Sequence, residues 1–117
     1  MRTLNRLKKN KDFQVVFKKG RSFANRQFVV YVLKQEGQSF SRLGLSVSKK
    51  MGNAVMRNHI KRFIKEIFRD LSDKLEPGID YIIISRRPVR TMTYQQMQNS
   101  LIHVLRKTGL MTEHKDI

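Results

Sequence analysis

The chain has 117 residues, the length of one domain, and its 25 lysine and arginine residues outnumber nine acidic residues, giving a formal charge of +16. Such an excess favours a polyanionic partner, nucleic acid or an acidic membrane surface, and the periodic blocks of hydrophobic residues argue against a disordered tail. The lack of cysteine excludes a disulfide framework or zinc ribbon, and no apolar run approaches the roughly 20 residues of a membrane span, so we expect a cytoplasmic protein.

The first half of the chain predicts one short helix and two strands. The helix extends from Asn10, its expected N-cap, to Gly20. The period then changes to two, which predicts a strand over residues 22–33. A second strand is predicted over residues 42–49, with an apolar core face. Its other face is small enough for a nucleic-acid backbone to approach closely, and it consists of Gly44, Ser46 and Ser48.

The second half predicts two helices and a buried strand. Asn53 is the expected N-cap of a long helix over residues 54–75, and residues 79–85 form a nearly continuous apolar run typical of a central strand. Thr93, with Gln96 three residues later, predicts a capping box for the last helix, which ends at Gly109. The order α-β-β-α-β-α predicts one α+β domain over residues 1–117, with residues 1–9 and 111–117 flexible.

Charge is distributed unevenly along the chain. Residues 63–80 carry three basic and five acidic side chains, so we expect this region, Asp80 included, to face away from a polyanion. The long helix carries its basic residues near its N-terminus, where the helix dipole disfavours cations and the free backbone N–H groups favour phosphate. An ordinary solvated face is the alternative. The unusual placement favours a clamp on an RNA or DNA backbone, formed by Lys49, Lys50, Arg57, Asn58, Lys61 and Arg62.

Aromatic residues suggest a second site. Phe13 and Phe17 lie one helical turn apart, and Tyr31 lies in a strand with apolar residues on both faces. A phenylalanine pair at this spacing is more often part of a core. Here the pair is surrounded by lysine and arginine, a pattern typical of platforms on which single-stranded bases stack.

Groups for catalysis are scarce. The three histidines, His59, His103 and His114, do not have the spacing of metal ligands, and no glycine-rich phosphate loop is present. The acidic residues of the long helix have the pattern of a solvated stripe. The sequence therefore indicates a binding protein with no catalytic residue and no metal site of its own.

The run from Gly44 to Arg62, GLSVSKKMGNAVMRNHIKR, closely resembles the signature of the bacterial ribonuclease P protein component family. The resemblance also covers Arg6 to Lys9, Asp12-Phe13, Ala24 to Arg26 and Ile82 to Pro88. One position departs from the family pattern. His59 stands where the family usually has a long basic or polar side chain, so no RNA contact is assigned to it.

The resemblance implies a fold and a function. The fold is an α-β sandwich similar to domain 2 of ribosomal protein S5, with a left-handed β-α-β crossover. The function is to bind a large catalytic RNA that removes the 5′ leader of precursor tRNA, with the active site and magnesium ions held by the RNA. The residues implied to bind the catalytic RNA are Arg57, Asn58, Lys61, Arg62 and Lys65. Those implied to bind the leader, in a cleft, are Phe13, Phe17, Tyr31, Lys49, Lys50, Arg86 and Arg87.

Three other functions are compatible with parts of the pattern. A structural ribosomal RNA-binding protein would have similar charge and fold, and is the main alternative. A stand-alone nuclease would cut precursor tRNA without added RNA. A membrane-surface role is the weakest, because the apolar arc of the long helix is the size of a core face and other elements can cover it.

Overall fold

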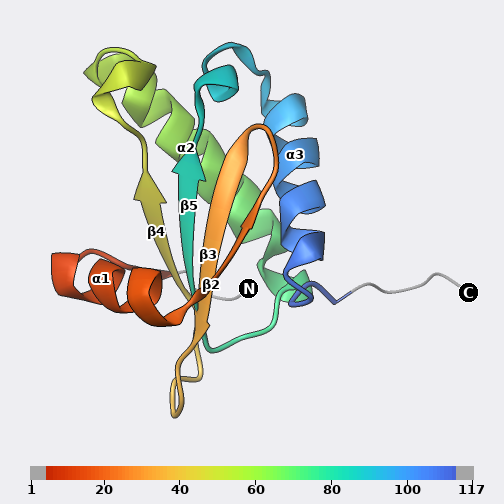
Figure 1. The fold of residues 1–117 in the computed structure, drawn as a ribbon. Coiled ribbons are helices and arrows are strands. Elements are labelled where there is room, and N and C mark those ends of the chain that lie inside the picture. The colour runs from red at the N-terminus through yellow and green to blue at the C-terminus, as the bar shows by residue number, and fades with distance from the viewer. Residues whose placement is uncertain (1–4, 113–117) are drawn as a thin grey trace, which may run out of the picture.

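The computed structural model describes residues 5–112. Its elements are arranged around one sheet (Figure 1). The strands are β1 (Asn5–Arg6), β2 (Arg21–Ala24), β3 (Phe28–Lys34), β4 (Arg42–Ser46) and β5 (Ile79–Ser85). The α-helices are α1 (Asn10–Lys19), α2 (Ala54–Leu71) and α3 (Tyr94–Lys107). Short 3-10 turns occupy Lys49–Met51, Ser72–Lys74 and Arg87–Thr91.

The sheet has the strand order β1-β4-β5-β3-β2, with β4 parallel to β5 and β3 antiparallel to it. In Figure 1 both β4 and β5 point upward, β5 lies to the right of β4, and α2 passes behind them. The β4-α2-β5 connection is therefore left-handed, whereas nearly all such crossovers are right-handed. This confirms the α+β class and the crossover that the family resemblance implies.

Two apolar layers lie on opposite faces of the sheet. Helices α2 and α3 cover one face, and α1 covers part of the other (Figure 1). Alternate residues of β5 face the two layers: Tyr81 and Ile83 belong to the large core under α2 and α3, whereas Ile82 packs with Val16 of α1. Because both faces of β5 are covered, its sequence is apolar at nearly every position.

The predicted strand over residues 22–33 is two strands. Asn25 breaks it, because its Oδ1 accepts hydrogen bonds from the backbone N–H groups of Gln27 at 3.0 Å and Phe28 at 2.8 Å. This side-chain turn lets β2 fold back and pair antiparallel with β3. Asparagine is a common turn residue, so the signal was present in the sequence but weaker than the surrounding alternation.

The N-caps of α2 and α3 are as predicted, whereas the start of α1 and the ends of α2 and α3 differ: α3 ends at Lys107, with Thr108 as its C-cap. Asn53 Oδ1 accepts a hydrogen bond from Met56 N at 2.9 Å, and Thr93 and Gln96 form the predicted capping box. The first helix instead has Lys9 as its N-cap and includes Asn10. The long helix ends at Leu71, and a 3-10 turn takes the chain to Lys74.

The terminal segments are more structured than expected where the structure describes them. Residues 5–9, predicted to be flexible, include β1, which pairs parallel with β4, and the buried Leu7. At the other end, Met111 forms a β-bridge with Leu75. The remaining parts of the predicted flexible segments, residues 1–4 and 113–117, lie outside the described residues.

Candidate nucleic-acid interface

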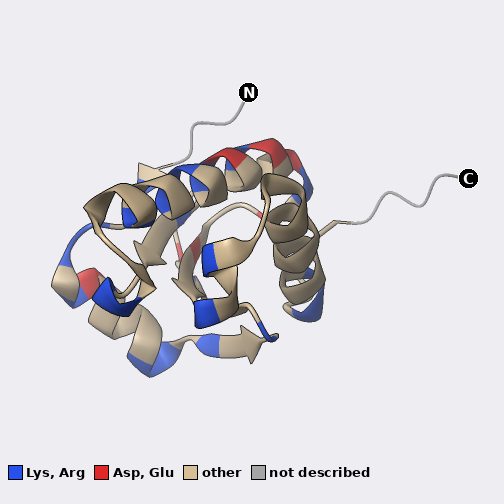
Figure 2. Cartoon of the chain, turned by 90° about the horizontal axis from the view of Figure 1, so that it is seen from above, with Lys and Arg blue, Asp and Glu red and all other residues tan. Residues whose placement is uncertain are grey.

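Charge changes sign along α2 (Figure 2). The N-terminal half carries four of the five residues predicted to bind the catalytic RNA, and the C-terminal half carries Glu66 and Asp70 together with Lys65 and Arg69. These two carboxylates lie beside Tyr94 of α3, and the pKa of Tyr94 is raised by its burial and then by Asp70 and Glu66. The acidic side chains of α2 therefore face the α3 side of the molecule, and its basic side chains are left for a polyanion.

The α2 cation surface consists of Arg57, Asn58, Lys61, Arg62 and Lys65. Asn58 and Arg62 are exposed, and the other three are half-buried. Arg57 is the most unusual of the set, because its Nε atom is buried and has no hydrogen-bond partner. A buried donor without a hydrogen bond raises the free energy of the folded protein. A phosphate oxygen that accepts from this guanidinium would therefore gain more binding free energy than one that accepts from an exposed side chain.

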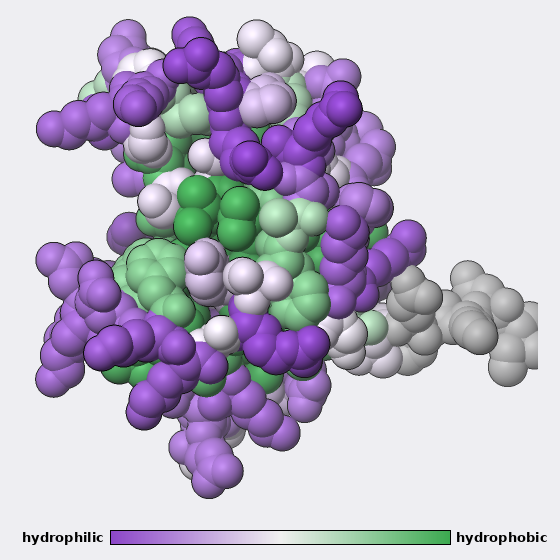
Figure 3. All heavy atoms as spheres, viewed as in Figure 1, coloured by the Kyte–Doolittle hydropathy of each residue, from purple (hydrophilic) through white to green (hydrophobic). Residues whose placement is uncertain are grey.

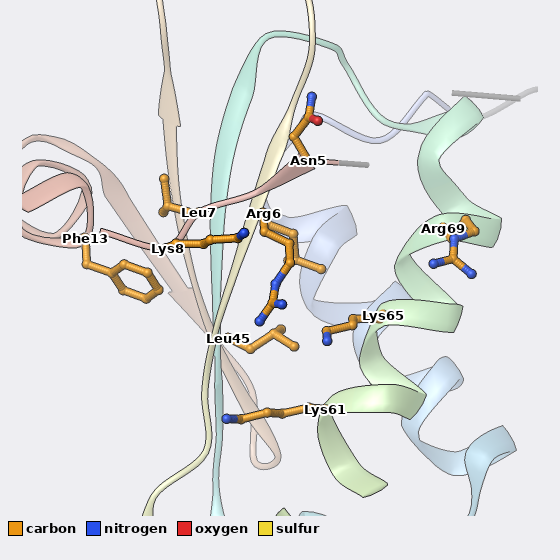
Figure 4. Close-up of a pocket in the computed structure, with 10 residues that line it drawn as sticks. Asn5, Arg6, Leu7, Lys8, Phe13, Leu45, Lys61, Lys65 and Arg69 are labelled. Carbon is orange, nitrogen blue, oxygen red and sulfur yellow. The ribbon is translucent and has the colours of Figure 1, made fainter. Parts of the chain in front are cut away.

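A pocket of about 430 Å³ extends the α2 cation surface toward the N-terminal segment (Figure 4). Its apolar wall consists of Leu7, Phe13, Leu43 and Leu45, so the pocket reaches the first turn of α1. Five of its ten lining residues are cationic and none is acidic; the cations are Arg6, Lys8, Lys61, Lys65 and Arg69. We call this the α2 pocket.

The cations of the α2 pocket repel one another. The pKa of Lys65 is lowered, first by burial and then by the positive charges of Arg6, Lys61 and Arg69. A bound phosphate would relieve this repulsion, so the pocket favours anions. Arg6 and Lys8 were not among the residues predicted to bind the catalytic RNA. The helical wheel of α2 does not contain them, since they reach the pocket only through the pairing of β1 with β4.

An aromatic cluster lies on the opposite face of the sheet. The ring of Phe17 is 6.2 Å from that of Phe13 and 4.9 Å from that of Tyr31, which it meets edge to face. Phe17 is 37% exposed, a high value for a phenylalanine, whereas Phe13 and Tyr31 are half-buried against the small core under α1. Figure 3 shows apolar side chains gathered on this face between hydrophilic ones. Phe17 is therefore the ring of the cluster most open to a stacking base.

The predicted open face of small residues on β4 is only partly open. A Cβ atom on Gly44 would lie 2.6 Å from Cζ of Phe13. The Phe13 ring therefore packs directly on Gly44 and covers it from solvent. The hydroxyl of Ser48 accepts a hydrogen bond from Lys50 N at 3.0 Å and caps the 3-10 turn. Both residues position other groups, which the alternation pattern could not reveal.

The four predicted basic residues outside α1 and α2 lie where β4 and β5 end. Lys49 and Lys50 are in the first 3-10 turn, Arg87 begins the third, and these two turns pack together. All four side chains are exposed, and Arg86 also donates a hydrogen bond to the carbonyl of Asn25 at 3.2 Å. The structure thus gathers Lys49, Lys50, Arg86 and Arg87 at one end of the sheet.

Asp80 was predicted to belong to an acidic surface, but it is fully buried. Arg42 donates to both of its carboxylate oxygens, at 2.8 and 2.6 Å, and Gln35 and Gln38 donate one hydrogen bond each. Burial raises the pKa of Asp80, but the hydrogen bonds from Arg42, Gln38 and Gln35 outweigh it and leave the pKa below its ordinary value. Asp80 is therefore an ionised structural group.

Histidine side chains take part in local packing. The ring of His59 lies 4.2 Å from that of Phe63, on the side of α2 that leads to Tyr94. Asn25 Nδ2 lies 3.3 Å from Nδ1 of His103. Within residues 5–112, no three histidine or acidic side chains are grouped so that they could hold a metal ion. In the same range, no helix is long and apolar enough to cross a membrane.

Comparison with known proteins gives a consistent result. Residues 1–109 match the family model described as Ribonuclease P. The ribonuclease P protein component of Listeria welshimeri is 56% identical over 115 residues, which cover 98% of this chain and 96% of that protein.

Solved structures agree with the sequence comparison. The RNase P protein of Staphylococcus aureus superposes with a TM-score of 0.86 at 50% identity, covering 92% of this chain and 97% of that one. The RNase P protein of Thermotoga maritima superposes with a TM-score of 0.80 at 34% identity. The match covers 88% of this chain and 96% of that one.

Proposed function

Because the chain belongs to the ribonuclease P protein family, we propose that it binds two RNAs at once, through surfaces on opposite sides of its sheet. One RNA is the catalytic subunit of ribonuclease P, and the other is the 5′ leader of precursor tRNA. The single observation that carries this proposal is that the α2 cation surface lies on a helix that covers one face of the sheet, whereas Phe17 and Tyr31 pack on the other face. The two sites approach each other at the edge of the sheet, where Phe13 lines the α2 pocket.

The α2 cation surface is the proposed contact with the catalytic RNA. It combines the unsatisfied Arg57 guanidinium, the mutually repelling cations of the α2 pocket and a helix N-terminus. All three favour phosphate whatever the base sequence. Such a surface suits a large folded RNA, whose backbone presents many phosphates in a fixed arrangement.

The aromatic cluster is the proposed site for the leader. Exposed Phe17 offers a ring on which an unpaired base can stack, and stacking tolerates any base. The exposed cations at the end of the sheet, Lys49, Lys50, Arg86 and Arg87, would then neutralise phosphates of the same strand. This combination suits a single-stranded segment of variable sequence.

We assign the chemical step and its magnesium ions to the RNA partner, and the complex to the cytoplasm. The protein's part is to neutralise phosphate and to hold the substrate, which raises substrate affinity and lowers the magnesium concentration that the RNA needs. This assignment is supported by the local packing roles of His59 and His103 and by the structural role of Asp80.

Cleavage of precursor tRNA at limiting magnesium tests the proposed function. We expect no cleavage by the protein alone, slow or no cleavage by the catalytic RNA alone, and rapid release of the leader when both are present. Cleavage by the protein alone would contradict the proposal and favour a stand-alone nuclease. An unchanged rate on adding the protein, with recovery of the protein on ribosomal subunits, would favour the structural ribosomal alternative.

Phe17→Ala should weaken binding of precursor tRNA to the assembled complex by roughly ten-fold, within the range for loss of one stacked base. Binding of mature tRNA, which has no leader, should not change. Equilibrium binding of the two ligands under identical salt and magnesium checks this. Equal losses for both ligands would show that Phe17 acts on folding or on RNA binding in general.

A further inference from the structure

The first turn of α1 is attached to β4 at two neighbouring points. Asp12 Oδ2 lies 3.6 Å from Nη1 of Arg42, and the ring of Phe13, the next residue, lies over Gly44. Arg42 and Gly44 are alternate residues of β4 and therefore share one face of the sheet. Two consecutive residues of α1, Asp12 and Phe13, thus contact two neighbouring residues on that face of β4.

The Arg42 end of this attachment is rigid. Its guanidinium binds the buried Asp80 through two hydrogen bonds, and Gln35 and Gln38 hold the same carboxylate from the other side. The remaining nitrogen, Nη1, faces Asp12. Asp12 therefore meets a cation whose position is fixed by the sheet, and the pair defines where α1 begins on it.

The Phe13 end of the attachment leads directly into the aromatic cluster. Phe13 packs against Phe17, and Phe17 meets Tyr31. A shift of the first turn would move Phe13 off Gly44 and remove the ring that supports Phe17 from one side. The orientation of the exposed Phe17 ring therefore depends on where the first turn of α1 lies.

The charge of Asp12 calls for an explanation. It is the only acid among the first 35 residues, which carry ten basic side chains. An acid beside an RNA site repels phosphate and by itself weakens binding. The favourable interaction of an acid in the first turn with the helix dipole is one explanation. That interaction does not require an ion pair with Arg42.

We propose that Asp12 and Arg42 are positioning residues for the aromatic cluster: their ion pair fixes the first turn of α1 on β4 and so sets the ring geometry that receives a leader base. This inference rests on the proposed leader site. It adds two residues that do not touch the leader themselves.

The test measures the ratio of mature-tRNA to precursor-tRNA dissociation constants for the protein assembled with its catalytic RNA. Asp12→Asn should lower this ratio about five-fold, near the lower end of what one stacked base contributes. Asp73→Asn is the matched control, because it removes the same charge from an exposed position after α2. It should leave the ratio unchanged. Asp12→Glu, which keeps the charge, should restore most of the ratio.

Simple electrostatics predicts the opposite sign. If Asp12 acted only as a repelling charge, Asp12→Asn would tighten binding of both ligands, as Asp73→Asn would. A ratio that stays constant or rises in Asp12→Asn, while Phe17→Ala lowers it, would overturn the positioning role and leave the leader site intact. A ratio that Phe17→Ala also fails to lower would overturn the leader site and this inference with it.

A second measurement follows the geometry without any RNA. In the free protein, the ring protons of Phe13 should show a nuclear Overhauser effect to the α-protons of Gly44. We expect this signal to weaken in Asp12→Asn and to persist in Asp73→Asn and Asp12→Glu. A signal of equal strength in all variants would contradict the proposal, because the ion pair would then not control the position of Phe13.

Discussion

Replacing Asp80 with asparagine should lower the free energy of unfolding by about 3 kcal/mol, because it removes one partner of a buried ion pair and leaves the other charge without it. Asp80 is fully buried, and its carboxylate accepts four hydrogen bonds from Arg42, Gln35 and Gln38. The Arg42 side chain is 23% exposed, which keeps the expected loss at the lower end of the range for such pairs. Urea unfolding of the two proteins measures the difference.

The exposed ion pair between Lys34 and Glu76 provides the control. Its atoms are 3.7 Å apart and its side chains are 72% and 45% exposed, so Glu76→Gln should change the free energy of unfolding by less than about 0.5 kcal/mol. Equal losses in the two variants would contradict the structural role of Asp80.

The same carboxylate predicts how stability depends on pH. The pKa of Asp80 is lower in the folded protein than in the unfolded chain, so the folded state favours the ionised form. Its contribution is therefore complete above the unfolded pKa, about 4, and is lost as the pH falls through the folded pKa. Asp80→Asn should remove this part of the acid transition. An equal loss of stability at low pH in the two proteins would contradict the conclusion that Asp80 is ionised in the folded state.

The double variant Arg57→Ala with Arg62→Ala should weaken binding to the catalytic RNA by about ten-fold or more, because each arginine is expected to neutralise roughly one phosphate. The plot of log affinity against log salt should become shallower by about one unit for each residue. Binding measured at several salt concentrations gives both values.

Lys34→Ala with Lys74→Ala removes two charges at the opposite end of the molecule and is the matched control. It should leave the salt dependence of binding to the catalytic RNA nearly unchanged. Urea unfolding of both double variants shows whether they remain folded. An equal loss of slope in the two would mean that the protein binds through its overall charge, and that the α2 cation surface has no special role.

Local signals explain the parts of the fold that the sequence predicts well. Residues 79–85 are apolar because β5 is covered on both faces, and the capping groups of Asn53 and Thr93 act within three residues of themselves. The α2 cation surface is likewise a property of one helix, readable from its 3.6-residue period. In each case the signal lies within one element of the sequence, although β5 packs against other elements on both faces.

The parts that the sequence does not predict depend on contacts between distant segments. Asp80 is separated from Arg42 by 38 residues, so the apolar run that surrounds Asp80 indicates burial but does not reveal the cation that pairs with it. The α2 pocket needs Arg6 and Lys8 beside Lys65, which only the pairing of β1 with β4 achieves. The handedness of the β4-α2-β5 crossover is of the same kind. It came from the family resemblance, because periodicity contains no such information.

The alternation of β4 shows a further limit. A strand pattern separates core residues from others, but it does not distinguish an open position from one covered by a ring of another element. Gly44 belongs to the second kind, since Phe13 occupies the space where its side chain would be. The close approach that small residues permit is used by the protein's own aromatic cluster.

The central claim is that two RNAs bind two separate surfaces, and a crossed binding experiment tests it most directly. Phe17→Ala and the Arg57→Ala, Arg62→Ala double variant are each assayed for binding to the catalytic RNA alone and, after assembly at saturating protein, for the ratio of precursor to mature tRNA affinity. We predict that Phe17→Ala lowers only the second quantity and the double variant lowers only the first. A loss of both quantities in both variants would contradict the claim and indicate one shared RNA-binding surface.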